Sequence, residues 1–316
     1  MEKTVNDIII IGGGPAGLTA GIYSARAAMN VLLIESTFSP SMITITDWVE
    51  NYPGFPEGIG GFEIVDKFRQ QAINCGLKSA YGDVSGIAQE SLNGKDVWKV
   101  TADENYFAHA IIFATGAKNA KLGCPGEAEF TGKGVSYCAT CDGPLFRNKE
   151  VVVVGGGDTA LEDGLFLTKF AKKVTIVHRR DRLRATKILQ ERAAANAKVE
   201  LCMDSVAVEI AGKAKVEAIK VKNVKTGAVK DIKCDGVFIF IGITPNSDIF
   251  KPIVKTDDKG YIVADDDMKT SCDGIFVCGD VRKKSLRQVV TATGDGATAA
   301  VSAQNYVERR KGVEYK

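Results

Sequence analysis

Two stretches of the sequence share one order of elements: an apolar strand, a turn of three consecutive glycines, a helix and a second strand. One runs from Asp7 to Glu35 and the other from Glu150 to His178. Each opens with a short apolar run that stops at glycine, which is typical of a strand buried on both faces. Because a helix that follows such a turn offers free N–H groups to a phosphate, the repeat predicts an α/β chain with two dinucleotide-binding halves.

The first turn has the G-x-G-x-x-G spacing. We predict that it binds a cofactor pyrophosphate through Gly12, Gly14, Pro15, Ala16 and Gly17. The second strand ends in Glu35, 23 residues after Gly12, and an acid about 20 residues on is the group that reads the ribose. A carboxylate there accepts hydrogen bonds from both ribose hydroxyls and repels a 2′-phosphate. This half therefore favours an unphosphorylated ADP group, as in FAD or NAD.

The second turn has the related G-x-G-x-x-A form. It runs from Gly155 to Ala160, and we predict that Gly155, Gly157, Asp158, Thr159 and Ala160 bind the second cofactor. Its second strand ends in His178, again 23 residues after the first glycine, and Arg179, Arg180 and Arg184 follow closely. Guanidinium groups bind a 2′-phosphate through charge-assisted hydrogen bonds. We therefore predict NADPH in this half, with His178 and the three arginines among its contacts.

Simpler interpretations of the second strand end remain open. Most runs of charge form a solvated surface, and Arg179, Arg180 and Arg184 would then be a basic patch without a ligand. His178 would be a packed or an exposed histidine with no role of its own.

One cysteine pair stands apart from the other cysteines. Cys138 and Cys141 lie two residues apart in Cys-Ala-Thr-Cys, and Asp142 follows. This spacing allows a small disulfide ring or an open dithiol, in which one thiolate is stabilised enough to react near neutral pH. Asp142 is the predicted group that holds or delivers the proton of each cycle.

A structural zinc site is the non-catalytic alternative for this pair. Zinc needs four ligands, usually in two clusters. The chain has only His109 and His178 and no second C-x-x-C. We therefore expect no metal.

The three predicted sites fit together through a flavin. A nicotinamide hydride does not normally attack a disulfide directly, whereas a flavin accepts hydride and reacts with a thiolate. The first half is therefore expected to hold FAD and the second to hold NADPH. Since a sulfur held against a flavin cannot also exchange with an external disulfide, we expect a domain motion between these steps.

Composition narrows the setting. At 316 residues the chain suggests two domains of about 150 residues each. A formal net charge of +2 argues against a role that depends on nucleic acid, and no apolar run is long enough to span a membrane. The apolar run at residues 8–11 lacks the features of a signal peptide. Eight cysteines with a single close pair indicate a reducing compartment, so we expect the protein in the cytoplasm.

We predict two Rossmann-like, three-layer ββα domains, the first of them discontinuous. The FAD-binding domain is expected over residues 1–117 and 248–316, and the NADPH-binding domain over 118–247. Within the first, residues 77–107 are predicted to form an antiparallel meander and residues 294–306 a close-packed helix. A strand over 274–280 ends in Asp280, which is either a surface acid or an acceptor for a ribityl hydroxyl of the flavin.

Over almost its whole length the sequence resembles the low-molecular-weight thioredoxin reductases, within the pyridine nucleotide-disulfide oxidoreductases. The matching motifs are Gly12–Gly17, Val49–Pro56, Phe113–Ala117, Cys138–Gly143, His178–Asp181 with Arg184 and Ala185, Gly279–Asp280 and Arg287–Val290. The resemblance implies a homodimer with one FAD per subunit, thioredoxin or a thioredoxin-like redoxin as partner, and an NADPH domain that rotates between two states.

The resemblance also implies roles for particular residues. It makes Cys141 the sulfur that meets the flavin, Cys138 the one that attacks thioredoxin, and Asp142 the acid–base group. The FAD contacts that it adds are Asn51, Thr115, Gly116, Gly279, Asp280, Arg287, Gln288 and Val289.

Two departures from the family pattern stand out. Pro40-Ser41-Met42 replaces a Gly-Gly-Gln that helps to seat the flavin, and Thr159 stands where serine is commoner. A second enzymatic alternative is reduction of another partner, such as a glutaredoxin-like or peroxidase-linked redoxin. We expect no fused redoxin domain before Met1, so any partner is expected to act in trans.

Overall fold

The chain divides into two compact units. Unit 1 comprises Met1–Lys118 and Thr244–Lys316, and unit 2 comprises Asn119–Ile243. The computed structural model describes residues 4–37, 41–45, 49, 51–92, 94–137 and 139–313. The chain passes between the units through β7 (Ala117–Asn119) and β16 (Ile243–Pro245), which pair with each other.

Unit 1 is built on a seven-stranded sheet. Its strands are β1 (Val5–Ile11), β2 (Val31–Glu35), β3 (Lys78–Tyr81), β4 (Gly86–Leu92), β5 (Lys95–Thr101), β6 (Asn105–Phe113) and β17 (Ile275–Val277). They are ordered β3-β2-β1-β6-β5-β4, and β17 pairs with β6. The pairs among β1, β2, β3, β6 and β17 are parallel, whereas β4 and β5 extend the sheet from β6 as an antiparallel meander.

The predicted meander is wrong at its first strand. β3 pairs with β2 in parallel and not with β4. Alternation of side chains indicates a half-buried strand but says nothing about the direction of its partner. The direction follows from the connection, because a helix between two strands of one sheet returns the chain in the same direction.

Consecutive residues of the central strands belong to different cores. Ile8 and Ile10 face one side of the sheet, and Ile9 and Ile11 face the other. A strand needs an apolar residue at every position only where both faces of the sheet are covered. The uninterrupted isoleucine run of β1 therefore reflects the layers on either side of it.

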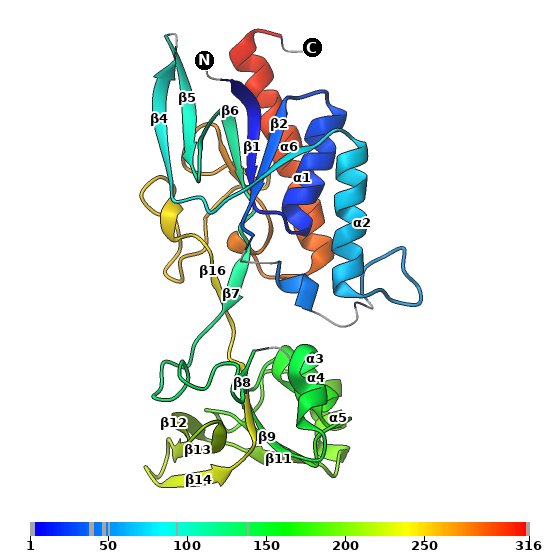
Figure 1. Cartoon of the computed structure of the whole chain (residues 1–316), viewed down its shortest axis with the longest axis vertical. Helices are drawn as coiled ribbons and strands as arrows, with labels where there is room; N and C mark the ends of the chain where they lie inside the picture. Colours follow the sequence, from blue (N-terminus) through cyan, green and yellow to red (C-terminus); the bar gives the residue numbers. More distant parts are fainter. Residues whose placement is uncertain are drawn as a thin grey trace. The chain divides into compact units, whose positions relative to one another are not determined.

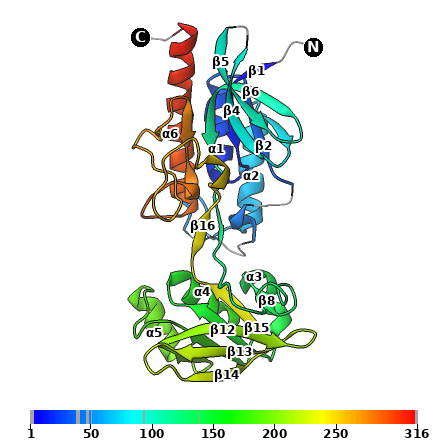
Figure 2. The same cartoon turned by 90° about the vertical axis from the view of Figure 1, so that its left-hand side faces the viewer.

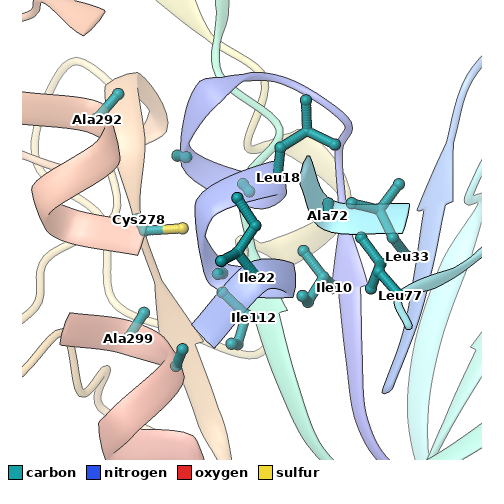
Figure 3. Close-up of a cluster of buried hydrophobic side chains, with 14 of the residues drawn as sticks. Ile10, Leu18, Ile22, Leu33, Ala72, Leu77, Ile112, Cys278, Ala292 and Ala299 are labelled. Atoms are coloured by element: carbon teal, nitrogen blue, oxygen red, sulfur yellow. The ribbon is translucent and has the colours of Figure 1, made fainter. Parts of the chain in front are cut away.

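Three helices cover one face of this sheet (Figures 1 and 2). They are α1 (Pro15–Arg26), α2 (Gly61–Asn74) and α6 (Val289–Lys311). Their apolar side chains pack with Ile10, Leu33 and Ile112 of the strands (Figure 3). The short helices of unit 1 are η1 (Met42–Ile45), η3 (Asp248–Phe250) and η4 (Gly279–Val281).

Helix α6 is longer than the predicted 294–306. It begins at Val289 because Gln288 and Thr291 form a reciprocal capping box, which satisfies N–H groups at the start of a helix. It ends at Lys311, where Gly312 adopts the left-handed conformation that commonly closes a helix. The prediction was too short because it relied on the small residues of 294–306, which mark only the part of the helix that packs most closely.

The opposite face of the unit 1 sheet is closed by residues that follow the second crossing. Phe250 stacks on Phe113 of β6 with ring centroids 3.7 Å apart, and both side chains are fully buried. The C-terminal part of the chain is thereby tied to the sheet that the N-terminal part builds.

Unit 2 repeats the plan with a smaller sheet. The parallel strands β8 (Val135–Ser136), β9 (Glu150–Gly155), β10 (Lys173–Val177), β11 (Val199–Cys202) and β15 (Gly236–Phe240) are ordered β11-β10-β9-β15-β8. One face carries α3 (Ala139–Asp142), η2 (Gly143–Phe146), α4 (Asp158–Leu167) and α5 (Lys187–Ala195). The other carries the antiparallel strands β12 (Ser205–Gly212), β13 (Val216–Asn223) and β14 (Val229–Lys233).

The alternation of β1 recurs in β9. Val151 and Val153 join the helical side of the core, and Val152 and Val154 join the side of the antiparallel strands. Both units are thus three-layer ββα folds, and the predicted fold class is confirmed. Among the described helices, none has the length and apolar character that crossing a membrane requires.

Replacement of Phe250 by alanine tests the closure of unit 1. We expect a loss of about 3–5 kcal/mol in the free energy of unfolding, because a buried ring is removed and a cavity remains. Phe62, 71% exposed in the same unit, is the matched control, and Phe62→Ala should change stability by about 0.5 kcal/mol or less. Urea denaturation followed by tryptophan fluorescence measures both, and equal losses would contradict the assignment.

Candidate active site and cofactor sites

The first glycine turn joins β1 to α1 at the carboxyl ends of the parallel strands. Gly12 has a φ of +113°, and a Cβ there would overlap the carbonyl of Ala114 after β6. Gly14 takes the N-cap position of α1, and Pro15, Ala16 and Gly17 form its first turn. The first N–H groups of a helix have no partner within it, so this turn can bind an anion with its backbone.

Glu35 lies at the end of β2, directly over the turn. A Cβ on Gly13 would overlap Oε2 of Glu35, which explains the glycine between the two motif positions. Arg69 of α2 donates to both carboxylate oxygens, with 2.9 Å between Nη2 and Oε2. A carboxylate has about four acceptor sites, so the pair leaves acceptor capacity for two ribose hydroxyls.

Sequence reasoning missed Arg69. It lies on a helix 34 residues away from Glu35, and no motif marks it. The hydrogen bond to Glu35 is the main cause of the raised pKa of Arg69, although burial acts in the opposite direction. Arg69 therefore fixes the orientation of the Glu35 carboxylate.

Residues from distant parts of the chain meet beside the first turn. Asn51 Nδ2 donates to Gln288 Oε1 at 2.9 Å, which joins two predicted FAD contacts that are 237 residues apart. Val289 begins α6, and Gly279 and Asp280 begin η4. The sites predicted from the resemblance thus gather at one edge of unit 1.

Two further predicted FAD contacts have structural partners. Thr115 Oγ1 donates to the carbonyl of Asn246 at 2.7 Å, and Asn246 Nδ2 donates to the carbonyl of Thr115 at 2.9 Å. The backbone N–H of Asn246 also donates to Gly116 O at 3.0 Å. These bonds tie the first crossing segment to the second. No sequence motif indicated that Asn246 would contact two of the predicted FAD-binding residues.

The residues of unit 1 fit FAD. The glycine turn ends at the free N–H groups of the α1 N-terminus, Glu35 keeps acceptor capacity beside Arg69, and the side chain of Asp280 is 32% exposed. The Nε of Arg287 is buried without a hydrogen-bond partner among the described residues, while its guanidinium carbon lies 4.0 Å from the ring of Tyr261. A buried donor of this kind calls for a partner. At the loop that departs from the family, Ser41 lies beside Gly14 and Pro40 is outside the described residues.

The second glycine turn joins β9 to α4 in unit 2. Gly155 is the last residue of β9, and Gly157 is the N-cap of α4. Asp158, Thr159 and Ala160 form the first turn of this helix. A Cβ on Gly156 would overlap the imidazole of His178, whereas one on Gly157 would meet nothing within 4 Å. The two glycines therefore serve different purposes: one makes room for a side chain and the other leaves the helix end open.

His178 is buried, with 5% of its surface exposed, and its ring packs on the turn. Burial lowers the pKa of His178 below its ordinary value, and the charges of Arg184, Arg180 and Arg179 lower it further, whereas a hydrogen bond that the imidazole donates to the backbone of Arg182 raises it. The imidazole is accordingly neutral at pH 7. The structure places it beneath the turn as a packed residue.

Hydrogen bonds hold the arginine-bearing loop beside the second turn. Gly156 O accepts from the N–H of Arg184 at 2.7 Å, and Asp158 Oδ1 accepts from the N–H of Thr186 at 2.6 Å. The side chains of Arg179, Arg180 and Arg184 are exposed, and within the described part of the chain none of them forms an ion pair with an acid. The loop therefore presents exposed guanidinium groups next to the N-terminus of α4.

The cysteine motif lies in unit 2, where α3 includes Cys141 and ends at the half-buried Asp142. Cys138 and the side chain of Cys141 lie outside the described residues. The segment before them is anchored by Tyr137, whose hydroxyl donates to Glu127 Oε1 at 2.7 Å. Glu127 also accepts from the N–H groups of Leu122 at 2.9 Å and Gly123 at 2.6 Å.

The six other cysteines are free thiols and buried or half-buried. They are Cys75, Cys124, Cys202, Cys234, Cys272 and Cys278. Burial raises the pKa of Cys124, Cys272 and Cys278, and that of Cys234 to about 12. A thiol with a raised pKa forms little thiolate and reacts slowly. Across the residues described, no cluster of three histidine, cysteine or acidic side chains could hold a metal.

The comparisons with known proteins agree with this architecture. The profile of the pyridine nucleotide-disulphide oxidoreductase family matches residues 6–296, and the chain belongs to this family. It is 49% identical to a thioredoxin reductase of Listeria monocytogenes, over 98% of this chain and 96% of the relative. It is 45% identical to a thioredoxin reductase of Treponema pallidum, over 97% of this chain and 98% of the relative.

A solved relative has the same fold. The crystal structure of Lactococcus lactis thioredoxin reductase in its FR conformation matches with a TM-score of 0.90 and 45% identity, and the match covers 96% of this chain and 99% of that one.

Alanine at the two neighbouring glycines of the second turn separates packing from binding. Gly156→Ala should lower the free energy of unfolding by about 1–3 kcal/mol, because the new methyl group displaces the His178 ring. Gly157→Ala should change it by about 0.5 kcal/mol or less but should weaken nucleotide binding, because the backbone must approach the pyrophosphate. Calorimetry without and with NADPH measures both effects. Equal destabilisation by the two substitutions would contradict the geometry.

Proposed function

We propose that the chain is an NADPH-dependent flavoprotein that reduces the disulfide of thioredoxin. One observation carries the proposal: two glycine turns of the same design lie beside side chains of opposite charge, Glu35 in unit 1 and the arginines after His178 in unit 2, and unit 2 also holds the Cys-x-x-Cys motif. The relatives that match over nearly the whole chain are thioredoxin reductases, which supports the same reaction here.

FAD would bind to unit 1, one per subunit. The groups proposed to hold it are the turn at Gly12–Gly17, Glu35, Asn51, Thr115, Gly116, Gly279, Asp280, Arg287, Gln288 and Val289. Arg69 would hold the Glu35 carboxylate in a fixed orientation through its hydrogen bonds. The N-terminus of α1 can offer its free N–H groups to an anion, which supports a pyrophosphate at this position.

NADPH would bind to unit 2. Gly155, Gly157, Asp158, Thr159 and Ala160 would hold its pyrophosphate, and Arg179, Arg180 and Arg184 its 2′-phosphate. The exposure of these arginines and the bonds that hold their loop support this role over a solvated patch. His178 would contribute by supporting the turn from beneath.

Bound FAD would supply the chemistry that takes a hydride from NADPH and delivers its electron pair to a disulfide. The Cys138–Cys141 bond breaks on receiving two electrons, and Asp142 would provide and recover the proton of the cycle. The thiolate of Cys138 then attacks the thioredoxin disulfide to form a mixed disulfide. Attack by Cys141 on Cys138 releases the thioredoxin dithiol and restores the disulfide.

We propose that unit 2 rotates between these steps, because one sulfur couple must react first with a flavin in unit 1 and then with an external protein. The two crossing segments, joined by the Thr115–Asn246 bonds, would be the pivot. A homodimer in the cytoplasm is the expected setting, since the thiol chemistry requires a reducing compartment.

Substitution of Arg179 and Arg180 tests the nucleotide assignment. Arg179→Ala/Arg180→Ala should reduce the preference for NADPH over NADH by about tenfold or more per arginine, because each charged hydrogen bond contributes about 1.5–3 kcal/mol. Arg182, which is 89% exposed and faces Asp181 at 4.0 Å, offers the control Arg182→Ala, with an unchanged preference. Stopped-flow flavin reduction measures the ratio, and an unchanged ratio in the double variant would refute the assignment.

The sulfur assignment is tested with Cys138→Ser. This variant should still accept electrons from NADPH into its flavin but should lose thioredoxin turnover, because the attacking thiolate is absent. Cys272→Ser, at a half-buried free thiol, should retain turnover. Full turnover by Cys138→Ser would disprove the mechanism, and a panel of redoxins in the same assay would show whether another redoxin replaces thioredoxin as partner.

A further inference from the structure

A group of charged side chains lies behind Asp280, on the side away from solvent. Lys284, Asp295 and Arg282 have side chains that are only 7%, 10% and 15% exposed. Arg282 donates to both oxygens of Asp295, from Nη2 at 3.2 Å and from Nε at 3.3 Å. Buried charges persist only when they are paired, so the group behaves as one network.

Lys284 is the member shared by two acids. Its Nζ lies 3.0 Å from Asp295 Oδ2 and 3.7 Å from Asp280 Oδ1, and it also donates to Thr291 Oγ1 at 3.3 Å. Asp295 Oδ2 accepts in addition from the N–H of Gly279 at 3.1 Å. The network therefore fixes both the backbone before Asp280 and the charge next to its carboxylate.

The two oxygens of Asp280 face different surroundings. Oδ1 is buried and has no hydrogen bond among the described residues, so the ammonium of Lys284 at 3.7 Å is its nearest compensation. The side chain as a whole keeps 32% exposure, which places the open part of the carboxylate on the Oδ2 side. An acid held in this way presents one oxygen outward as a hydrogen-bond acceptor.

We propose that Lys284 is a positioning residue of the flavin site: anchored by Asp295, it keeps Asp280 ionised and turned outward to accept from a cofactor hydroxyl. This inference rests on the proposed FAD site and adds a residue that neither the motifs nor the resemblance indicated. Without the ammonium, burial and the nearby charge of Asp295 would both favour the neutral form of Asp280.

The groups around Asp280 act on its pKa in both directions. Burial is the main cause that raises the pKa of Asp280 above its ordinary value, and the charge of Asp295 also raises it. The charges of Lys284 and then of Arg287 lower it, and the hydroxyl of Tyr261 is the other titratable neighbour. Loss of Lys284 removes the leading opposition to burial. The pKa of Asp280 then rises, so the fraction ionised falls first at acid pH, and with it the capacity to accept from FAD.

The test compares FAD affinity across pH in Lys284→Met, Lys284→Arg and Lys283→Met. Lys283 is the exposed neighbour and the matched control. Apoproteins are titrated with FAD between pH 5.5 and 8.5 and followed by flavin fluorescence. We expect Lys284→Met to weaken binding by about 10–100-fold at the acid end, corresponding to one charge-assisted interaction, with recovery as the pH rises. Lys284→Arg should restore the wild-type profile, and Lys283→Met should share it.

The outcomes are decisive. Equal affinity and equal pH dependence in wild type and Lys284→Met would overturn the inference while leaving the proposed function intact. A wild-type protein that does not bind FAD would instead overturn the proposed function. If Lys284→Met does not fold by circular dichroism, Lys284→Gln replaces it; failure of both neutral variants to fold would show that the charge serves stability alone and would also overturn the inference.

Discussion

Close approach of backbone to backbone at the ends of the parallel strands is the constraint on which the two sites depend. At Gly12 a methyl group would overlap the carbonyl of Ala114, so β1 can turn into α1 only without a side chain. The turn places the first N–H groups of the helix at the sheet edge, where they attract an anion. The residues that we propose as cofactor contacts lie around this edge.

The two units share this backbone turn but differ in the side chain that stands at the end of the second strand. In unit 1 the strand ends in an acid, which Arg69 holds with two hydrogen bonds. In unit 2 the equivalent position is a buried neutral imidazole under Gly156, and the charge comes from the arginines that follow. One fold is thus adapted to two nucleotides by changing which side chain is buried and which reaches solvent.

Burial also separates the cysteines by reactivity. The free thiols of Cys234 and Cys278 are buried and have raised pKa values, which suppresses thiolate formation at neutral pH. A redox protein benefits from this, because a stray thiolate could attack a disulfide and form an unwanted mixed disulfide. The network around Lys284 acts on an acid in the opposite sense, because the charge of Lys284 lowers the pKa of Asp280 against the burial that raises it.

The sequence predicted the layers, the two glycine turns and the offset of 23 residues to each strand end, because periodicity and glycine spacing are local properties. It did not predict that β3 pairs with β2, that Arg69 binds Glu35, or that Asn246 joins the two crossings, because these contacts link residues far apart in the chain. It also could not tell whether His178 was packed or exposed. The local order of residues determined which backbone each unit would form, and only the tertiary structure decided which polar groups are buried together, because burial and charge pairing depend on neighbours that the chain brings together by folding.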